Sequence, residues 1–60
     1  EEVELAVRKK NGVTYLFLLN YMFREETITL KKECIDLFTG EKKEGNVTLK
    51  PFEVLVVRVD

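Results

Sequence analysis

Carboxyl groups are the side chains of this sequence that most readily suggest catalysis. Asp36 can be combined with Glu41 or with Glu53, and two carboxyl groups on either side of a glycosidic bond can cleave it as acid and as base or nucleophile. Eleven of the 60 residues are acidic, however, so such combinations arise by chance. Because Asp and Glu are mostly exposed and solvated in folded proteins, we interpret these carboxylates as surface charges.

Three side chains have the chemical type of a nucleophile: Thr14, Cys34 and Thr39. None of them has a suitable base close by in the chain. A reactive Cys requires a cationic environment that lowers the pKa of its thiol, and Lys31 and Lys32 do precede Cys34. We nevertheless interpret Cys34 as a small, half-buried strand residue.

The composition gives metal and cofactor chemistry little support. The sequence contains no His and only one Cys, Cys34, which excludes a disulfide within the chain and the zinc and iron–sulfur frameworks built from several Cys and His ligands. The glycines, Gly12, Gly40 and Gly45, are isolated from one another and form no phosphate-binding loop. We therefore expect no catalytic residue, metal or cofactor in this chain.

The elements that must position these residues are all patterned as short β-strands. Residues 2–9 alternate apolar and polar side chains, as in a strand with one buried face, whereas the spacing of an amphipathic helix never persists. The expected strands cover residues 2–9, 13–20, 27–30, 34–38, 47–49 and 53–59. Short strands separated by turns predict one all-β domain over residues 1–60, a small antiparallel β-sandwich of about six strands.

Five residues are expected to have structural roles at turns and strand ends. Asn11-Gly12 is the strongest hairpin signal, because both residue types tolerate a positive φ. Gly40 marks a second turn, and Pro51 interrupts a strand because it lacks an amide hydrogen. Asn20 ends an apolar strand, where we expect its side chain to bond nearby backbone; the alternative is a polar contact to a ligand or a neighbouring domain.

The strand expected at residues 13–20 is apolar on both faces. One face carries Tyr15, Phe17 and Leu19, and the other carries Leu16 and Leu18. A strand of a small antiparallel domain normally needs apolar side chains on one face only, and a chain of 60 residues can hardly surround two cores. We therefore expect something outside the chain to cover the second face, with Tyr15 and Phe17 as interface residues.

The register of the first hairpin decides which face is the core. A two-residue turn at residues 11–12 places Lys10 opposite Val13. A three-residue turn places Lys9 opposite Val13 and matches the apolar side chains of the first strand with Phe17 and its neighbours. A slip of one residue exchanges the two faces of the strand. We favour the three-residue turn, because it matches large apolar side chains across the pair.

The segment Tyr21-Met22-Phe23 places three large apolar residues where a polar loop is expected. Either one or two of them cover the end of the sandwich, or they form a docking patch, because clustered exposed apolar residues mark interfaces. An aromatic platform for sugar, made by Tyr21 and Phe23, is a third interpretation. We count all three residues as candidate interface residues.

Charge and hydropathy limit the partners. Ten basic and eleven acidic residues give a net charge of −1, which argues against binding nucleic acid or an anionic membrane. No apolar stretch approaches the ~20 residues that span a bilayer. A lone thiol is compatible with a reducing cytoplasm, where we expect the protein. Because the chain begins with Glu1 instead of Met, we expect a fragment or a processed chain.

Four segments follow one another in an order that resembles a known family. They read YLFLLN at 15–20, ITL at 28–30, DLFTGE at 36–41 and VTLKPFEV at 47–54. This order resembles the C-terminal β-sandwich domain of β-galactosidases of glycoside hydrolase family forty-two, and similar small sandwiches end other barrel glycosidases. Two segments depart from the family pattern. The loop after Asn20 is usually polar but reads Tyr21-Met22-Phe23 here, and the closing turn has Lys50-Pro51-Phe52-Glu53 in place of two prolines and a glycine.

The resemblance implies a non-catalytic accessory domain that packs against a glycosidase and stabilises it, within a possible homo-oligomer. Catalysis would then belong to two glutamates of a separate (β/α)₈ barrel, and none of those positions maps onto this chain. Two alternatives stay open: a carbohydrate-binding module that uses Tyr21 and Phe23, and a free-standing β-domain that contacts proteins by adding a strand at an open edge.

Overall fold

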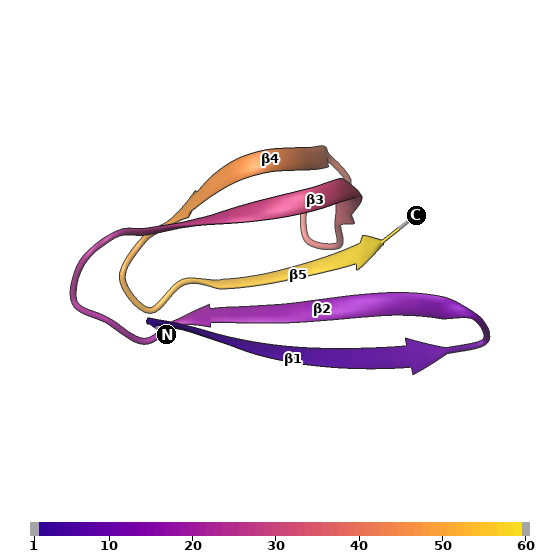
Figure 1. The fold of residues 1–60 in the computed structure, drawn as a ribbon, viewed down its shortest axis with the longest axis horizontal. Helices are drawn as coiled ribbons and strands as arrows, with labels where there is room; N and C mark the ends of the chain where they lie inside the picture. The colour runs from indigo at the N-terminus through magenta and orange to yellow at the C-terminus, as the bar shows by residue number, and fades with distance from the viewer. Residues whose placement is uncertain (1, 60) are drawn as a thin grey trace.

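The computed structural model describes residues 2–59 and contains five β-strands. They are β1 (Val3–Lys10), β2 (Val13–Asn20), β3 (Glu26–Asp36), β4 (Lys42–Leu49) and β5 (Val54–Val59) (Figure 1). Every strand pairing is antiparallel, and none of residues 2–59 lies in a helix. The prediction of an all-β antiparallel domain is therefore confirmed.

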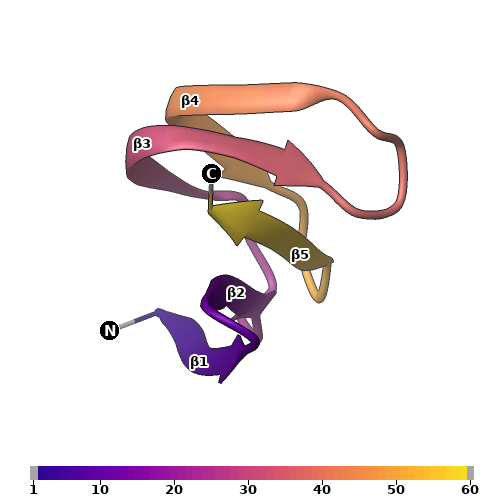
Figure 2. The same cartoon turned by 90° about the vertical axis from the view of Figure 1, so that its right-hand side faces the viewer.

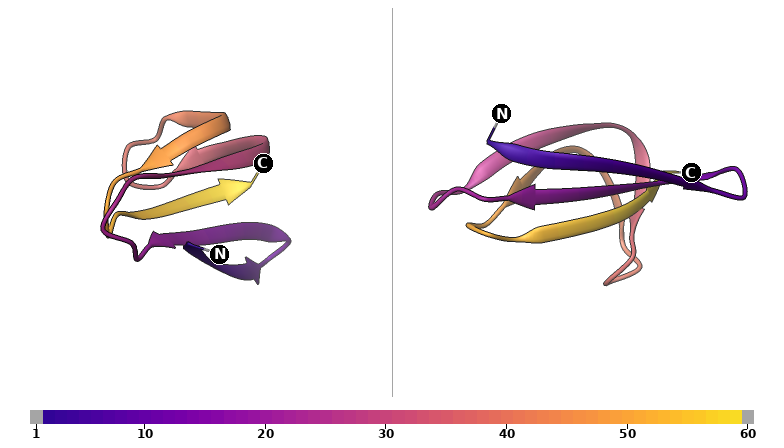
Figure 3. Two further views of the ribbon diagram at one scale, coloured as in Figure 1. Left: turned by 60° about the vertical axis from the view of Figure 1, so that its left-hand side comes forward. Right: turned by 90° about the horizontal axis from the view of Figure 1, so that it is seen from below.

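The five strands form one hydrogen-bonded sheet in the order β1-β2-β5-β3-β4. Figure 1 shows this order from the lower to the upper edge, and the views in Figures 2 and 3 show how strongly the strands turn relative to one another. β-Strands made of L-amino acids have an inherent right-handed twist. The twist lets one sheet enclose a core along one of its faces, in a body measuring 35 × 19 × 18 Å.

The sheet has five strands, where the sequence predicts about six, because two expected strands are continuous. The sequence predicts separate strands at residues 27–30 and 34–38, but β3 runs without a break from Glu26 to Asp36, and Leu37 and Phe38 lie in the turn that follows. Its pairing with β4 changes register between Leu30 and Cys34. The polar residues 31–33 thus form a bulge within a strand, where the sequence pattern suggests a break.

The hairpin between β1 and β2 has the two-residue turn. Lys10 lies opposite Val13, and Asn11 and Gly12 have φ values of 53° and 78°, as a type I′ turn requires. The three-residue turn that the side-chain sizes favour is therefore wrong. A type I′ turn matches the twist of the two strands, and this local geometry outweighs the pairing of large side chains that the alternative register offers.

This register places the core on the face of β2 that carries Leu16 and Leu18. Leu18 is 6% exposed, and Val57 of β5, on the same face, is fully buried. We call this side of the sheet the inner face. Its core cluster consists of Leu18, Leu30, Cys34, Leu49, Leu55 and Val57, with Val3, Leu16, Ile28, Val47 and Val59 packed against it.

Candidate functional site

The opposite side of the sheet, which we call the outer face, also carries apolar side chains, beside the charged Glu4, Arg8 and Arg58. It carries Tyr15, Phe17 and Leu19 of β2, Val54 and Val56 of β5, and Leu37, which follows β3. Ala6 lies opposite Phe17, Phe17 opposite Val56, and the amide of Leu37 donates to the carbonyl of Val56 at 2.9 Å. These contacts make a continuous apolar row that crosses the sheet from β1 to the end of β3.

The side chains of the outer face remain accessible to solvent. Phe17, Leu37 and Val54 are 41%, 45% and 48% exposed. Val56 is 9% exposed, because its neighbours in the row flank it on both sides. A shallow hollow of about 170 Å³ near Phe17, Leu19 and Val54 marks this face further. Contiguous exposed apolar surface of this kind is typical of an interaction site.

The loop between β2 and β3 carries a second exposed apolar group at the end of the sheet. Tyr21 is 46% and Phe23 89% exposed, and Met22 is half-buried. The ring of Phe23 contacts the ring of Phe52 edge to face, with centroids 5.0 Å apart and an interplanar angle of 86°. Tyr15 lies roughly 17 Å from the end of β2 at the usual rise per residue. The structure therefore divides the candidate interface residues between the outer face and this loop.

Phe52 makes this contact with Phe23 from an unfavourable backbone conformation. Its φ is 60°, a left-handed conformation that costs a residue with a Cβ about 1 kcal/mol or more. It follows Pro51 in a turn closed by the Glu53 amide, which donates to the Lys50 carbonyl at 3.0 Å, and the Glu53 carboxylate accepts from the Lys50 amide at 2.8 Å. Proline followed by a positive φ is the pattern of a type II turn, which favours Gly at this position.

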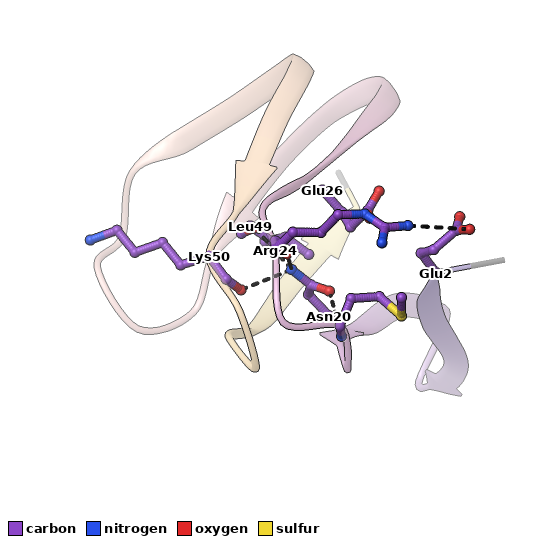
Figure 4. A network of polar contacts seen from close by, with 7 residues as sticks. Glu2, Asn20, Arg24, Glu26, Leu49 and Lys50 are labelled. Atoms are coloured by element: carbon purple, nitrogen blue, oxygen red, sulfur yellow. Dashed lines mark hydrogen bonds and ion pairs between the residues drawn. The ribbon is translucent and has the colours of Figure 1, made fainter.

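The side chain of Asn20 ties three segments together and is fully buried. Its Nδ2 donates to the carbonyl oxygens of Arg24, Leu49 and Lys50 at 2.8, 3.1 and 3.0 Å, and its Oδ1 accepts from the Met22 amide at 2.9 Å. Figure 4 shows this network from close by. These four partners are backbone groups of this chain, so the geometry is that of a structural residue at a strand–loop junction.

Arg24 adds an ion pair beside this network. Its Nε lies 2.7 Å from Oε2 of Glu26, and its Nη2 lies 3.7 Å from Oε2 of Glu2 (Figure 4). Arg24 is well exposed, so these contacts add little to stability. They nonetheless orient the loop that carries Phe23 relative to the start of β1.

The carboxylate of Asp36 closes the turn after β3. Its Oδ1 accepts from the Phe38 amide at 2.8 Å, and its Oδ2 lies 4.0 Å from Nζ of Lys43, which is also 3.9 Å from Oε1 of Glu41. Asp36 and Glu41 thus share one lysine at a turn. Because Asp36 lies opposite Val57, Glu53 is separated from it by roughly 13 Å of strand.

The candidate nucleophiles lie apart from one another on the sheet. Cys34 is buried in the core, and its Sγ lies 3.3 Å from the Lys32 carbonyl. Thr14 is on β2 opposite Val59, and Thr39 is in the turn after β3, where its hydroxyl accepts from the Glu41 amide at 3.2 Å. Within residues 2–59, no group of three or more Cys, Asp and Glu side chains is arranged to hold a metal ion.

The described part of the chain contains no helix long and apolar enough to cross a membrane.

The predicted interface residues make up only part of the exposed apolar surface. Tyr15 and Phe17 share one face of β2, as the strand pattern predicts, and the register of the β1–β2 hairpin makes it the outer face. Val54, Leu37, Phe38 and Phe52, which are 48%, 45%, 69% and 51% exposed, are not among the predicted interface residues. The sequence does contain a sign that Phe52 is unusual, because Phe52 follows Pro51 at a turn position that favours Gly. No sequence feature marks Leu37 in this way, because only the strand order brings it beside β5.

Comparisons with known proteins agree with one another. Residues 2–59 match the family model described as the beta-galactosidase C-terminal domain. The chain is 41% identical over 56 residues to the beta-galactosidase BgaA of Planococcus sp. and 30% identical over 54 residues to the beta-galactosidase GalA of Bacillus licheniformis; these matches cover 92% and 90% of this chain and 8% of each relative.

Two solved structures contain the same fold. The beta-galactosidase from Bacillus circulans sp. alkalophilus superposes with a TM-score of 0.91 at 33% identity, covering 100% of this chain and 9% of that one. A catalytic mutant of Gan42B, a GH42 beta-galactosidase from G. stearothermophilus, gives a TM-score of 0.92 at 30% identity, covering 98% of this chain and 9% of that one. The chain thus spans less than a tenth of the length of these relatives. With its family model matched over residues 2–59, this chain belongs to the family of beta-galactosidase C-terminal domains.

Proposed function

We propose that residues 1–60 are one accessory domain of a longer glycosidase that acts on β-galactosides, and that this domain has no catalytic role. The outer face docks on the rest of that enzyme and stabilises it. The observation that carries this proposal is the exposed apolar row through Phe17, Val56 and Leu37, on a sheet whose inner face already encloses a core. The relatives' names support the substrate class.

Burial of the outer face supplies the driving force. Phe17, Leu37 and Val54 are each about half exposed, so covering each of them contributes about 1 kcal/mol. The loop residues Tyr21, Met22 and Phe23 extend the contact at the end of the sheet. Buried Asp36, engaged in its turn, and the separated nucleophiles support the absence of catalysis from this domain.

The test is complementation in trans with the relative BgaA. BgaA is prepared without the segment that matches this chain, and the chain is added as a separate polypeptide. We expect the truncated enzyme to bind the chain and to unfold at a higher temperature in its presence, because the outer face becomes buried. Phe17→Lys and Val54→Lys should abolish both effects, because each places a charge in the apolar contact.

A matched control places the same charge elsewhere. Thr48 is exposed on edge strand β4, two strands away from β5 and outside the apolar row, so Thr48→Lys should leave binding unchanged. Equal binding by Thr48→Lys and Phe17→Lys, or the failure of the unaltered chain to bind or stabilise the truncated enzyme, would contradict the proposed docking.

The carbohydrate-binding alternative predicts a different result. The alternative uses the rings of Tyr21 and Phe23, and the ring of Phe23 is engaged edge to face with Phe52 at 86°. A galactoside titration followed by NMR should therefore leave the resonances of Tyr21 and Phe23 unshifted; saturable shifts there would favour a sugar-binding module. An open reading frame that continues upstream of Glu1 would exclude the free-standing domain. We retain the cytoplasm as the proposed compartment, supported by a sequence with a single cysteine, which suits a reducing environment.

A further inference from the structure

The sheet has two edge strands, β1 and β4, and they differ in how open they are to pairing. β4 contains Gly45 at a φ of 78° and faces the register shift of β3, features that discourage further pairing. β1 contains neither Gly nor Pro and pairs with β2 regularly along all eight residues. In the right-hand view of Figure 3, β1 is the strand nearest the viewer. β1 is thus the open edge of the described sheet.

The backbone groups that point outward from β1 belong to its odd-numbered residues. The type I′ turn makes Lys10 and Val13 a hydrogen-bonded pair, and such pairs alternate along an antiparallel ladder. Two observations agree with this alternation. The carbonyl of Val7 accepts from Arg8 Nη1 at 3.1 Å, and the amide of Asn20, which lies opposite Val3, donates to the carbonyl of Glu53, away from β1.

The side chains of β1 are self-complementary about Ala6. When a second β1 strand is placed antiparallel with Ala6 opposite Ala6, Glu4 lies opposite Arg8. The next residues inward bring Leu5 opposite Val7, which are 55% and 46% exposed. Further out, Glu2 lies opposite Lys10 and Val3 opposite Lys9. Both members of each odd-numbered pair carry outward backbone groups, so the ladder can close.

We propose that β1 pairs antiparallel with β1 of a second copy of this chain about a two-fold axis through Ala6. The two sheets then become one continuous sheet, Leu5 and Val7 are covered, and Glu4 of each copy faces Arg8 of the other. Arg8 leaves the Val7 carbonyl, which accepts instead from the backbone amide of Leu5 in the second copy.

Other arrangements of the same edge are less favourable. A shift of two residues in either direction leaves one kind of opposite-charge pair in place of two. It keeps Glu4 opposite Lys10 or Glu2 opposite Arg8, and it places Ala6 opposite Arg8 or Glu4. A parallel arrangement in register places Glu4 beside Glu4, and like charges directly opposite each other are destabilising. The acidic first half and basic second half of β1 thus favour an isologous pair, which closes instead of growing into a fibre.

The experiment exchanges the charges of Glu4 and Arg8 and measures dimer formation by sedimentation equilibrium. It uses the full 60-residue chain at concentrations up to millimolar. The unaltered chain should form dimers. Glu4→Arg and Arg8→Glu should each raise the dimer dissociation constant by about tenfold or more, because each places like charges opposite each other. A mixture of the two variants should form heterodimers, and the double variant should dimerise as the unaltered chain does.

A covalent test checks the position of the axis. Ala6 and Ala6 of the second copy form a non-hydrogen-bonded pair, whose Cα separation of about 4.5 Å suits a disulfide. Mild oxidation of Ala6→Cys should give covalent dimers, whereas Arg8→Cys, which lies opposite Glu4, should give few. Circular dichroism of each variant is the control, and it should show that the β structure is retained.

Several outcomes overturn the proposal. They are a chain that stays monomeric at millimolar concentration, single charge reversals that do not weaken association, and equal crosslinking by the two Cys variants. Phe17→Lys separates this pairing from docking through the outer face, since dimers should persist in that variant. Loss of dimers in Phe17→Lys alone would place the contact on the outer face and refute pairing at β1.

Discussion

At the scale of single residues, the buried amide of Asn20 shows how a polar side chain can hold a small sheet together. It joins the end of β2 to the following loop and to the turn between β4 and β5 through four hydrogen bonds. Those segments are more than twenty residues apart in the chain, and one amide satisfies backbone groups from both. In a domain without a disulfide, such a contact replaces a covalent link.

Asn20→Ala should lower the free energy of unfolding by about 2–4 kcal/mol, because it leaves several buried backbone groups unpaired. Urea denaturation followed by circular dichroism measures the change. Asn46→Ala is the matched control: Asn46 is exposed and accepts one hydrogen bond from Thr29 at 2.8 Å, so its loss should cost less than about 1 kcal/mol. Equal effects of the two substitutions would show that the buried network does not stabilise the fold.

Phe52 provides a second residue-scale test, because it keeps a large side chain at a positive φ. Phe52→Gly and Phe52→Ala both remove the contact with Phe23, but only Gly relieves the backbone. We expect the Gly variant to be more stable than the Ala variant by about 1 kcal/mol, the reverse of their usual order in a strand. An Ala variant as stable as the Gly variant in thermal unfolding would show that the turn is not strained.

At the scale of elements, the β1–β2 hairpin determines which side of the sheet becomes the core. Its turn sets the register, and the register puts Leu18 inward and Leu19 outward. Both faces of β2 are apolar, so side-chain character did not distinguish them. The same alternation leaves Phe17 and Val54 on the outer face, where they form the candidate docking surface.

Matched Leu→Ala substitutions on β2 test this assignment. Leu18→Ala should lower the free energy of unfolding by about 3 kcal/mol, because it opens a cavity in the core. Leu19→Ala should cost about 1 kcal/mol, because Leu19 retains partial contact with solvent. Chemical denaturation of both variants gives the comparison; a larger loss for Leu19→Ala would mean that the other register is populated.

At the scale of the whole molecule, a chain of 60 residues has a small core and a large apolar exterior. Domains of this size bury only about 60% of their unfolded surface, and total stabilities are typically about 0.05–0.15 kcal/mol per residue. We therefore expect the chain alone to be marginally stable, and its exposed outer face to be covered in a larger protein.

An apolar dye should report this exposed face directly. We expect the isolated chain to enhance 1-anilinonaphthalene-8-sulfonate fluorescence while folded, and Phe17→Lys to reduce the enhancement, because the charge interrupts the apolar row. Thr48→Lys serves as the control with an unchanged response. Unaltered fluorescence in Phe17→Lys, at equal stability, would locate the dye site elsewhere and weaken the assignment of the outer face.

The sequence alone determined the all-β class, most of the strands and turns, and the family. It did not determine the length of β4, which covers residues 42–49 where a strand is expected only at 47–49. Strand alternation and turn residues are local properties, so residues 13–20 and Asn11-Gly12 could be interpreted without any knowledge of the fold. The segments that carry the family resemblance could be recognised for the same reason. The sequence predicts a break between two strands at residues 31–33, where the structure has a bulge within β3. A few polar residues within a strand form the same sequence pattern as the end of a strand.

Only the tertiary structure decided which apolar face is buried and what lies beside it. Alternation separates the two faces of β2 but says nothing of which one β3 and β4 will cover, since that depends on register and on pairings between distant segments. The same long-range order brings Leu37 beside Val56 and makes β1 an open edge. The candidate docking face and the self-complementary edge both follow from strand order, which no local pattern in the chain encodes.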